Sequence, residues 1–558
     1  MAAQPPCGPA ADPAKARRAA APSAEEGGIV EGLAGASGAA PKAGGGDQAG
    51  AEGCAPVASR AQSCVCLAAV FLARFEVSAI ALCIPPVAAE FGVSLELAAW
   101  VHLAGNFAAT MTGPPVAKLA DMHGRERVWH ASFLLLTCST WLAALAPSLP
   151  ALLVARAATG AAHSGIFAPS LALLAQGLAP SERGAVASTV MTADTLGSSI
   201  GMLAGGAAVA RFSWRAVFLL PAVPMAFLWL LSLGLLIPRT AAQGGAELLR
   251  FDVRGASCFA GASLCLLLAL NRGNDLGWSS PTVVGLTLAS VLLFFALARE
   301  ERFAENPVIP SWLFAGRVPV TLLLVLMSAS SCYGSTLLLL PLFLQDGLGM
   351  GPGRISGLLV PRPLTAMLTS AAMTCALRRS GGGGTAERLS LARAGSLVLL
   401  AAYVVINVTA RLEQGAAFFT LLELQICLQA AGHFVTTLSA NALLVASVPA
   451  EQLANASAIQ KVLSATATLL MTTLGVAASR AADGAEEPGS YRTPWLMALA
   501  VASLPAWLLW AVPAGAEGAL PPAASPGAGR ARAVPAQLLG KAPAPPEAAA
   551  QPAARPST

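Results

Sequence analysis

The sequence has few charged side chains for its length. Lysine, arginine, aspartate and glutamate make up only 11% of the 558 residues, whereas an average soluble domain is about 25% charged. A soluble protein of this length needs far more polar surface than these side chains provide. The scarcity of charge therefore excludes an ordinary soluble protein, and it directs attention to the hydrophobic residues, which make up 55% of the chain.

Signals for nucleic-acid binding, metal binding and enzymatic catalysis are also missing. The net charge is only +5, and we find no nucleic-acid motif and no sustained basic patch. The eleven cysteines show no metal-type spacing and mostly lie inside apolar runs, which is typical of small core residues. No nucleophile motif or phosphate loop is visible. We therefore expect a protein that is not an enzyme, with no catalytic residues, no metal and no cofactor.

The hydrophobic residues occur in long continuous blocks. A span needs about 20 mostly apolar residues, because the hydrocarbon core is about 30 Å thick and a helix rises about 1.5 Å per residue. Continuous runs favour helices over a barrel, whose strands alternate apolar and polar residues. The sequence predicts an all-α polytopic membrane protein with fourteen spans, at 63–85, 97–119, 129–148, 150–174, 187–209, 216–237, 254–271, 281–299, 319–344, 355–377, 393–410, 416–440, 454–477 and 493–512.

The two ends of the chain and the loops between the spans predict the orientation. Residues 1–60 and 514–558 are rich in small residues and proline and have few large apolar side chains, so we expect two disordered tails. Fourteen lysines and arginines follow even-numbered spans and seven follow odd-numbered spans. Because positive loops are usually cytoplasmic, both tails are predicted to be cytoplasmic, in the plasma membrane or an organelle membrane.

A charged loop follows the second predicted span and reads PVAKLADMHGRER at 115–127. Asp121 places an acid at the membrane surface beside Arg125 and Arg127, and Gly124 permits the tight turn that leads into span 3. A charge cluster of this kind can latch two helix bundles in one state and release them in another. The alternative interpretation is a loop that is merely solvated.

The first span contains an acidic residue, Glu76, two positions before Ser78. A carboxyl group within a span costs roughly 2.5–3.5 kcal/mol on insertion scales and usually faces the bundle interior. Glu76 is therefore a candidate proton carrier. The alternative is a carboxylate that is held permanently by a cation such as Arg74 or Arg156. Arg74 lies about 200° around the helix from Glu76, so a direct pair between them is awkward.

Spans 4 and 5 each contain a further pattern. Arg156 lies deep in span 4, where a lone arginine needs a counter-charge or a water-filled path. It is a candidate partner of the proton site, and snorkelling toward the interface is the alternative. Glycines recur every four residues in span 5, which lets helices approach closely. This glycine stripe consists of Gly197, Gly201 and Gly205, with Gly206 following it.

Other polar residues within the spans are candidates to line a transport pathway. His102 and Asn106 lie one turn apart on span 2. For each candidate, a structural hydrogen bond is the alternative explanation. The full set is Ser78, His102, Asn106, Asp194, Arg362, Glu423 and Gln429.

Four of these segments resemble motifs of the major facilitator superfamily, in its fourteen-span drug:proton antiporter branch. The loop after span 2 is similar to the family's signature loop, with Ala117 in place of the leading glycine. Glu76 falls on the acidic position of the first-span motif, and Arg156 falls on the arginine of the span-4 motif. The glycine stripe resembles the antiporter motif, although Met202 replaces its proline. The matches follow the family's order over roughly residues 75–220.

The resemblance implies a fold with two six-helix bundles around a central cavity. Their predicted limits are 61–238 and 317–513, with a linker and inserted helices 7 and 8 at 239–316. By analogy, rocking of the bundles would export small organic compounds in exchange for protons. A uniporter or symporter of a metabolite, such as an organic acid, amino acid or sugar, is an alternative that Met202 favours. A non-transporting membrane receptor is another. The expected partners are a small-molecule substrate, protons and lipid, without nucleic acid, and a monomer is expected.

Overall fold

The protein is represented by a computed structural model that describes residues 59–235, 252–303, 309, 317–379, 384–448, 452–481 and 491–511. These residues form helices joined by short turns, and no strand occurs in this part of the chain. The predicted disordered tails lie outside the described residues, except that the first helix already begins at Arg60. An all-α fold is thereby confirmed.

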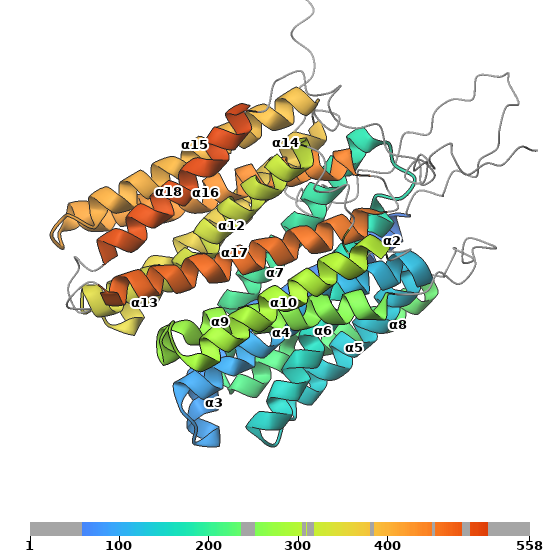
Figure 1. Ribbon diagram of the computed structural model, residues 1–558, viewed down its shortest axis with the longest axis horizontal. Helices are drawn as coiled ribbons and strands as arrows, with labels where there is room; N and C mark the ends of the chain where they lie inside the picture. Colours follow the sequence, from blue (N-terminus) through green and yellow to red (C-terminus); the bar gives the residue numbers. More distant parts are fainter. Residues whose placement is uncertain are drawn as a thin grey trace, which may run out of the picture.

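The N-terminal bundle consists of α2 to α8 (Figure 1). Its elements are α2 (Arg60–Ala79), the 3₁₀ segment η2 (Ile80–Cys83), α3 (Ile84–Phe91), α4 (Leu95–His123), α5 (Arg125–Ala144), α6 (Leu149–Leu174), α7 (Pro180–Arg211) and α8 (Trp214–Leu235).

Local sequence signals account for several of these boundaries. The Ser59 side chain accepts a hydrogen bond from the Gln62 amide, and the Gln62 side chain accepts one from the Ser59 amide, which caps the start of α2. Pro85 and Pro86 lack amide hydrogens, so regular helical bonding cannot run through them. The first predicted span is accordingly divided between α2, η2 and α3. Gly92, with a φ of 61°, ends α3 in the left-handed conformation.

The second half of the chain contains an inserted pair of helices and the C-terminal bundle. The inserted pair is α9 (Val253–Leu276) and α10 (Pro281–Phe303). The C-terminal bundle comprises α12 (Arg317–Leu342), the π-helical segment η3 (Phe343–Gly347), α13 (Pro352–Leu359), α14 (Pro361–Arg379), α15 (Thr385–Thr409), α16 (Ala416–Ser447), α17 (Leu453–Ala481) and α18 (Arg492–Ala511). The predicted span 355–377 is divided between α13 and α14, because Pro361 and Pro363 provide no amide donors there.

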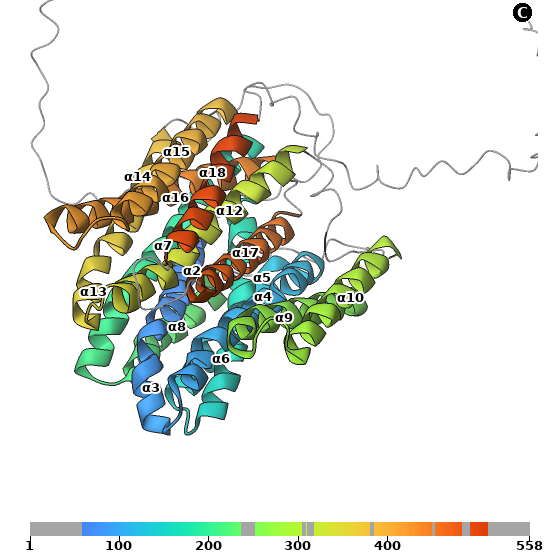
Figure 2. The ribbon, with the colours of Figure 1, turned by 60° about the vertical axis from the view of Figure 1, so that its left-hand side comes forward.

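The two bundles repeat one packing scheme. In the N-terminal bundle α2 packs on α7 and α8, α6 packs on α4 and α5, and α5 packs on α8. In the C-terminal bundle the corresponding pairs are α12 with α17 and α18, α16 with α14 and α15, and α15 with α18. The bundles occupy the lower and upper parts of Figure 1, with α7 and α17 between them. The inserted pair packs on α4 and α17, at the edge of the molecule (Figure 2).

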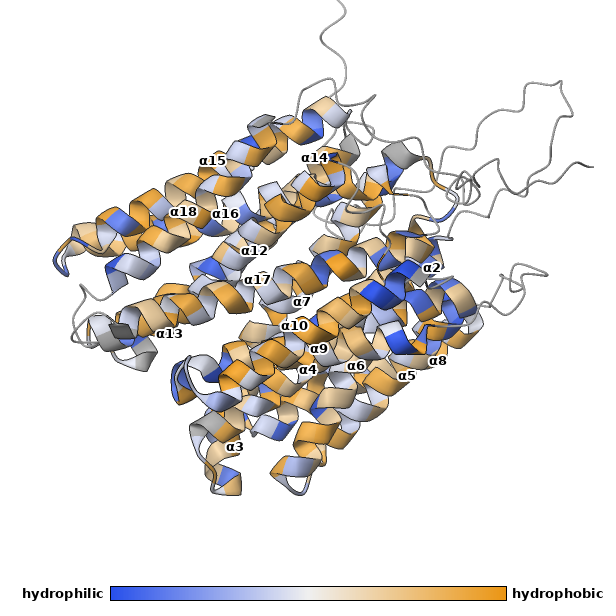
Figure 3. Ribbon diagram, in the orientation of Figure 1, coloured by the Kyte–Doolittle hydropathy of each residue, from blue (hydrophilic) through white to orange (hydrophobic). Residues whose placement is uncertain are grey.

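The lengths and hydropathy of the helices agree with the predicted spans. Each of the fourteen predicted spans coincides with a helix or with consecutive helical segments of the described chain. Within the part of the chain that the structure describes, ten helices are long and apolar enough to cross a membrane, namely α2, α6, α8, α9, α10, α12, α15, α16, α17 and α18. Four further helices of the described chain, α4, α5, α7 and α14, are also long but more polar, and hydrophobic residues still cover much of the helices (Figure 3).

The contacts that join the two bundles gather in one half of the molecule. The Thr192 hydroxyl on α7 lies 2.6 Å from the Thr374 hydroxyl and 2.9 Å from the Ser370 hydroxyl, both on α14. Arg183, near the start of α7, donates a hydrogen bond of 3.1 Å to the carbonyl of Val448 at the end of α16. These contacts lie in the half that contains the α6–α7 and α16–α17 connections, which are predicted to be cytoplasmic.

Candidate functional site

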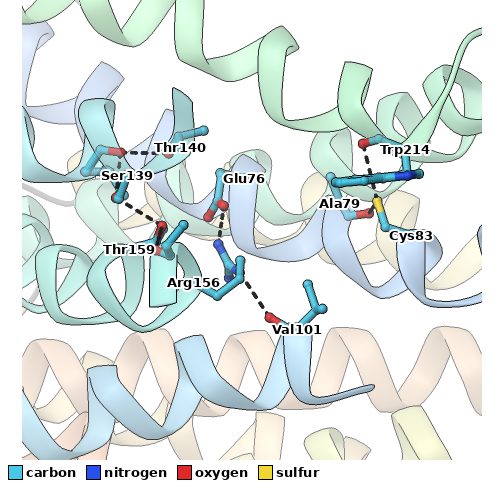
Figure 4. A network of polar contacts seen from close by, with 11 residues as sticks. Glu76, Ala79, Cys83, Val101, Ser139, Thr140, Arg156, Thr159 and Trp214 are labelled. Carbon is cyan, nitrogen blue, oxygen red and sulfur yellow. Dashed lines mark hydrogen bonds and ion pairs between the residues drawn. The ribbon is translucent and has the colours of Figure 1, made fainter. Parts of the chain in front are cut away.

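A buried ion pair lies at the centre of the N-terminal bundle. Arg156 on α6 donates from Nη1 to Oε1 of Glu76 on α2, and it donates from Nε to the carbonyl of Val101 on α4 at 3.1 Å (Figure 4). Both charged side chains are almost completely buried. The structure therefore pairs Glu76 with Arg156 rather than with Arg74, and Arg156 does not snorkel to the interface.

Two glycines make room for the guanidinium group. A β-carbon at Gly105 on α4 would lie 2.7 Å from Nη2 of Arg156, and one at Gly160 on α6 would overlap the backbone of Gly105. Any larger residue would push α4 and α6 apart, because the atoms in the way are backbone or part of the ion pair. The sequence had not indicated Gly105, since an isolated glycine on an apolar helix carries no recognisable pattern.

One oxygen of the Glu76 carboxyl group stays without a partner. Oε2 is buried and accepts no hydrogen bond from any residue that the structure describes. Unpartnered buried oxygens of a carboxylate are costly, and a proton bound at Oε2 would remove the charge of the group and so reduce this cost. Within the described residues no three His, Cys, Asp or Glu side chains are arranged to hold a metal ion. The site is thus equipped for charge and proton chemistry.

A second group of charges, the central charge cluster, consists of Arg74, Asp194 and Lys461. Nε of Arg74 on α2 lies 3.6 Å from Oδ2 of Asp194 on α7, and Nζ of Lys461 on α17 lies 3.3 Å from Oδ1. The cluster therefore crosses from one bundle to the other. Sequence analysis missed Lys461, although a single lysine within predicted span 13 was a usable signal. Arg74 faces Asp194 rather than Glu76, in agreement with its place around the helix.

The other pathway candidates have various surroundings. The Ser78 hydroxyl lies 2.8 Å from the hydroxyl of Ser198 on α7, which is a contact between helices. His102 and Asn106 hydrogen-bond to each other along α4, with 2.9 Å between Nε2 and Nδ2. Glu423 is exposed on α16. None of these side chains hydrogen-bonds to Glu76 or Arg156, and their role as pathway residues stays a prediction.

The charged loop after α4 pairs Asp121 with Arg125. Nε and Nη2 of Arg125 each lie 3.2 Å from Oδ1 of Asp121, one turn earlier, and Gly124 turns the chain with a φ of 99°. Arg127 is exposed. Arg183 of the bundle contact lies close by, where burial and the positive charge of Arg125 lower its pKa. The loop therefore lies beside a contact between the bundles.

The glycine stripe of α7 packs directly on α2. A β-carbon at Gly197 or Gly201 would overlap the backbone of Phe71 or Phe75, and one at Gly205 would lie 2.7 Å from the β-carbon of Ala79. Gly206 follows the stripe and is half-buried. The stripe thus serves close helix packing, and α7 continues without interruption through Met202. Ala117, at the family's glycine position on α4, is completely buried.

An exposed ion pair lies at the end of the N-terminal bundle where α3 meets α8. Nη1 of Arg215 lies 2.5 Å from Oε1 of Glu90, and the indole of Trp214 donates to Oε2 at 2.6 Å. These hydrogen bonds to Arg215 and Trp214 lower the pKa of Glu90 below its usual value. They also join the end of α3 to the start of α8.

The C-terminal bundle has an uncharged polar network at its centre. Nε2 of Gln429 on α16 donates to the Thr336 hydroxyl on α12 at 2.8 Å, and that hydroxyl lies 2.9 Å from the hydroxyl of Tyr403 on α15. Tyr403 donates to the carbonyl of Cys332 at 2.6 Å. All four residues are buried. The sequence had indicated only Gln429 of this group, as a candidate pathway residue, because the other neutral side chains within apolar spans give little signal.

Several known proteins are similar to this chain. Multidrug resistance protein 3 of Bacillus subtilis is 26% identical over 310 residues, which cover 54% of this chain and 59% of that protein. The puromycin resistance protein pur8 of Streptomyces alboniger is 30% identical over 255 residues, which cover 46% of this chain and 50% of that protein. The chain thus matches about half the length of these curated relatives.

Solved structures and a family model extend the similarity to most of the chain. The human organic anion transporter MFSD10 aligns with a TM-score of 0.56 at 15% identity, over 81% of this chain and 99% of that one. A bacterial homologue of the iron transporter ferroportin, in an outward-facing state, aligns with a TM-score of 0.52 at 15% identity, over 81% of this chain and 98% of that one. These two likenesses concern the fold. The family model described as Major Facilitator Superfamily matches residues 66–472, and the chain therefore belongs to the major facilitator superfamily of membrane transporters.

Proposed function

We propose that the protein is a secondary active transporter that exports small organic compounds in exchange for protons, with Glu76 as the proton carrier. The observation that carries this proposal is the buried pair of Glu76 and Arg156, in which Oε2 of Glu76 has no partner among the described residues. A carboxyl group inside a span usually has a functional reason, because its burial is costly. Here the carboxyl group has both a counter-charge and a vacant oxygen.

Protonation would change the forces at this site. A proton on Oε2 removes the negative charge of Glu76, and the attraction that holds Arg156 to α2 then weakens. Arg156 keeps its hydrogen bond to the carbonyl of Val101 on α4, so the change acts mainly between α2 and α6. In a transporter that rocks its two bundles around a midplane site, such a change can bias one orientation over the other.

The direction of transport and the orientation in the membrane belong to the same proposal. Both tails would be cytoplasmic, so the contacts of Arg183 and Thr192 with the C-terminal bundle would close the cytoplasmic side. The bundles would extend over 61–238 and 317–513, with 239–316 as linker and inserted pair. The names of the multidrug and puromycin resistance relatives support export of organic compounds.

Proton flux in proteoliposomes tests the proposal. The purified protein is reconstituted, a pH gradient is imposed, and a panel of lipophilic cations, drugs and metabolites is added while the internal pH is followed. We expect at least one compound to trigger proton movement in the parent. We expect Glu76→Gln, and the paired variant Glu76→Gln with Arg156→Gln, to reduce this movement to the level of protein-free liposomes. Glu413→Gln, in the exposed α15–α16 connection, should leave it unchanged.

A uniporter or symporter of a metabolite is the second candidate. The observation that favours it is α7, which runs as one helix of 32 residues with Met202 where the antiporter motif has proline. A uniporter would move compounds down their gradients without proton movement in the same vesicles. Compound flux that is equal in the parent and in Glu76→Gln, without proton movement, would reject the carrier role of Glu76 and favour this second candidate.

A further inference from the structure

We propose that Arg74 and Lys461 form the binding site for the carboxylate group of an organic anion, at the place where Asp194 bridges them. This inference rests on the proposed transport function, because it names the substrate class of the transporter. The three residues come from both bundles: Arg74 and Asp194 from α2 and α7, and Lys461 from α17. The central charge cluster is distinct from the buried pair of Glu76 and Arg156.

The central charge cluster contains more positive than negative charge. Arg74 and Lys461 both face the single carboxylate of Asp194. The neighbouring Glu76 is already engaged by Arg156, so it does not offset the excess. Charges inside a membrane protein are costly and are usually paired. One further carboxylate would balance the two cations, and the cluster is thus matched to a monovalent anion.

Arg74 has the donors that such a ligand requires. Its Nε lies 3.6 Å from Oδ2 of Asp194, which is longer than a hydrogen bond, and this nitrogen has no hydrogen-bond partner in the described chain. The Arg74 side chain nevertheless retains 37% of its surface. A guanidinium group offers parallel N–H donors that fit the two oxygens of a carboxylate. Arg74 therefore faces Asp194 without a hydrogen bond from its buried Nε, and the exposed part of its side chain remains open to a ligand.

Lys461 supplies the second half of the site from the opposite bundle. Its ammonium group donates one hydrogen bond to Oδ1 of Asp194 at 3.3 Å, and it has three donors in all. The nitrogen lies 3.2 Å from the centre of the Phe167 ring, which fixes it beside an apolar surface. The side chain keeps 35% of its surface. Donors thus remain for a ligand that approaches Arg74 at the same time.

A ligand held by both cations would connect the two bundles. Arg74 moves with the N-terminal bundle and Lys461 with the C-terminal bundle, so the distance between them depends on how the bundles are oriented. A carboxylate that binds both therefore favours the orientation in which they are close, which is the differential affinity that a conformational shift requires. Asp194 would compete with the ligand for the same donors. If Asp194 were only a structural bridge, the opposite result would be expected, because removing its carboxylate would loosen the cluster and weaken ligand binding.

Paired ligands distinguish a carboxylate site from an unspecific apolar one. The full-length protein is purified in detergent, and equilibrium binding is measured for benzoate, 1-naphthoate and octanoate, each beside its uncharged amide. We expect at least one carboxylate to bind roughly tenfold more tightly than its amide. In Arg74→Gln and Lys461→Gln this preference should fall to about one, since a lost charge-assisted contact is worth about that factor. Arg411→Gln, an exposed change in the α15–α16 connection, should keep it.

Two further variants separate binding from misfolding. Asp194→Asn removes the competing carboxylate, so we expect it to increase the preference for the carboxylate, which a damaged protein would not do. Arg74→Lys keeps the charge and should retain more of the preference than Arg74→Gln. The inference is overturned if no carboxylate is preferred in the parent, if both glutamine variants keep the preference, or if Asp194→Asn abolishes it. Displacement of the carboxylate by an equal concentration of chloride would overturn the assignment to an organic anion.

The proteoliposome panel distinguishes a failure of this inference from a failure of the proposed function. Proton-coupled flux of neutral or cationic compounds, without any preference for carboxylates in the binding assay, would retain the transport function and overturn the anion site. A carboxylate preference that depends on Arg74 and Lys461, without coupled flux of any compound, would retain the anion site and reject proton-coupled export.

Discussion

The two bundles share one packing scheme but have different polar groups at their centres. In the N-terminal bundle the first and fourth helices, α2 and α6, are joined by the charged pair of Glu76 and Arg156. In the C-terminal bundle the corresponding helices, α12 and α16, are joined by the neutral contact between Thr336 and Gln429. Since a neutral hydrogen bond joins the corresponding helices in the second bundle, the repeated fold does not require an ion pair at this place. The charges of the first bundle therefore agree with the proton-carrier role proposed for Glu76.

The third helix of each bundle takes part in the same way. On the N-terminal side the hydroxyl of Thr159 on α6 donates to that of Ser139 on α5 at 3.1 Å, beside the ion pair (Figure 4). On the C-terminal side Tyr403 of α15 links α12 and α16. The two centres thus occupy corresponding places in a repeated arrangement. The first centre contains an ionisable carboxyl group and a guanidinium group, and the second consists of groups that stay neutral near pH 7.

The largest expected effect comes from removing one charge of the buried pair. Glu76→Gln leaves the Arg156 guanidinium buried without a counter-charge, and we expect it to destabilise the protein by about 3–5 kcal/mol. Arg156→Gln should cost less, because the isolated Glu76 can become neutral by binding a proton, whereas arginine cannot lose one. Denaturation midpoints in detergent measure both effects.

The paired variant, Glu76→Gln with Arg156→Gln, serves as the control for this comparison. It gives the N-terminal bundle a neutral centre like that of the C-terminal bundle, and we expect it to recover most of the stability that Glu76→Gln loses, because replacing a buried ion pair as a unit is often nearly neutral. A paired variant as unstable as Glu76→Gln alone would contradict the view that the fold does not need the charges.

A smaller effect is expected in the neutral network. Gln429→Leu removes the amide that donates to Thr336 and Tyr403, and an ordinary buried hydrogen bond contributes about 0.5–1.5 kcal/mol. The loss of stability is moderated because Oε1 of Gln429 has no hydrogen-bond partner in the described chain, so its removal breaks no contact. The denaturation midpoint should fall modestly, and proton-coupled flux should keep its pH dependence. A loss of coupling in Gln429→Leu would mean that both bundle centres take part in proton transfer.

The smallest effect is expected at the exposed pair of Glu90 and Arg215. Because its hydrogen bonds lower the pKa of Glu90 below the usual value of 4.5, the pair stabilises the protein above about pH 4.5, and this contribution is lost as the pH falls through the lowered pKa. Exposed pairs contribute about 0–1 kcal/mol. Denaturation midpoints of the parent and of Glu90→Gln, measured between pH 7 and pH 3, should differ slightly at neutral pH and converge in acid. A difference that grows in acid would contradict the assignment.

The fold could be predicted from the sequence because its signals are local. Apolar blocks of membrane length gave all fourteen spans, and Gly124 gave the turn between α4 and α5, which needs a positive φ. Glu76 and Arg156 could be identified one by one, because a charge inside a span is conspicuous wherever it occurs. Their contact could be proposed as one of two possibilities, and the structure brings them together.

The contacts between bundles could not be predicted, because they join residues that are far apart in the chain. Asp194 and Lys461 are 267 positions apart, and no periodicity relates one helix to another at that distance. The repeated arrangement was also hidden, since Thr336, Tyr403 and Gln429 share no residue type with Glu76 and Arg156. The similarity between the bundles lies in where the polar groups are placed rather than in which groups are used.

The close packing of α7 on α2 has a mechanical consequence. At Gly197, Gly201 and Gly205 the two backbones touch without side chains between them, so the helices have no layer along which they could slide past one another. The two helices are therefore expected to move together as one rigid unit. In this unit α7 carries Thr192 and Asp194, which contact the C-terminal bundle, and α2 carries Glu76. Any rocking of the bundles is thereby transmitted rigidly to the helix that holds the buried carboxyl group.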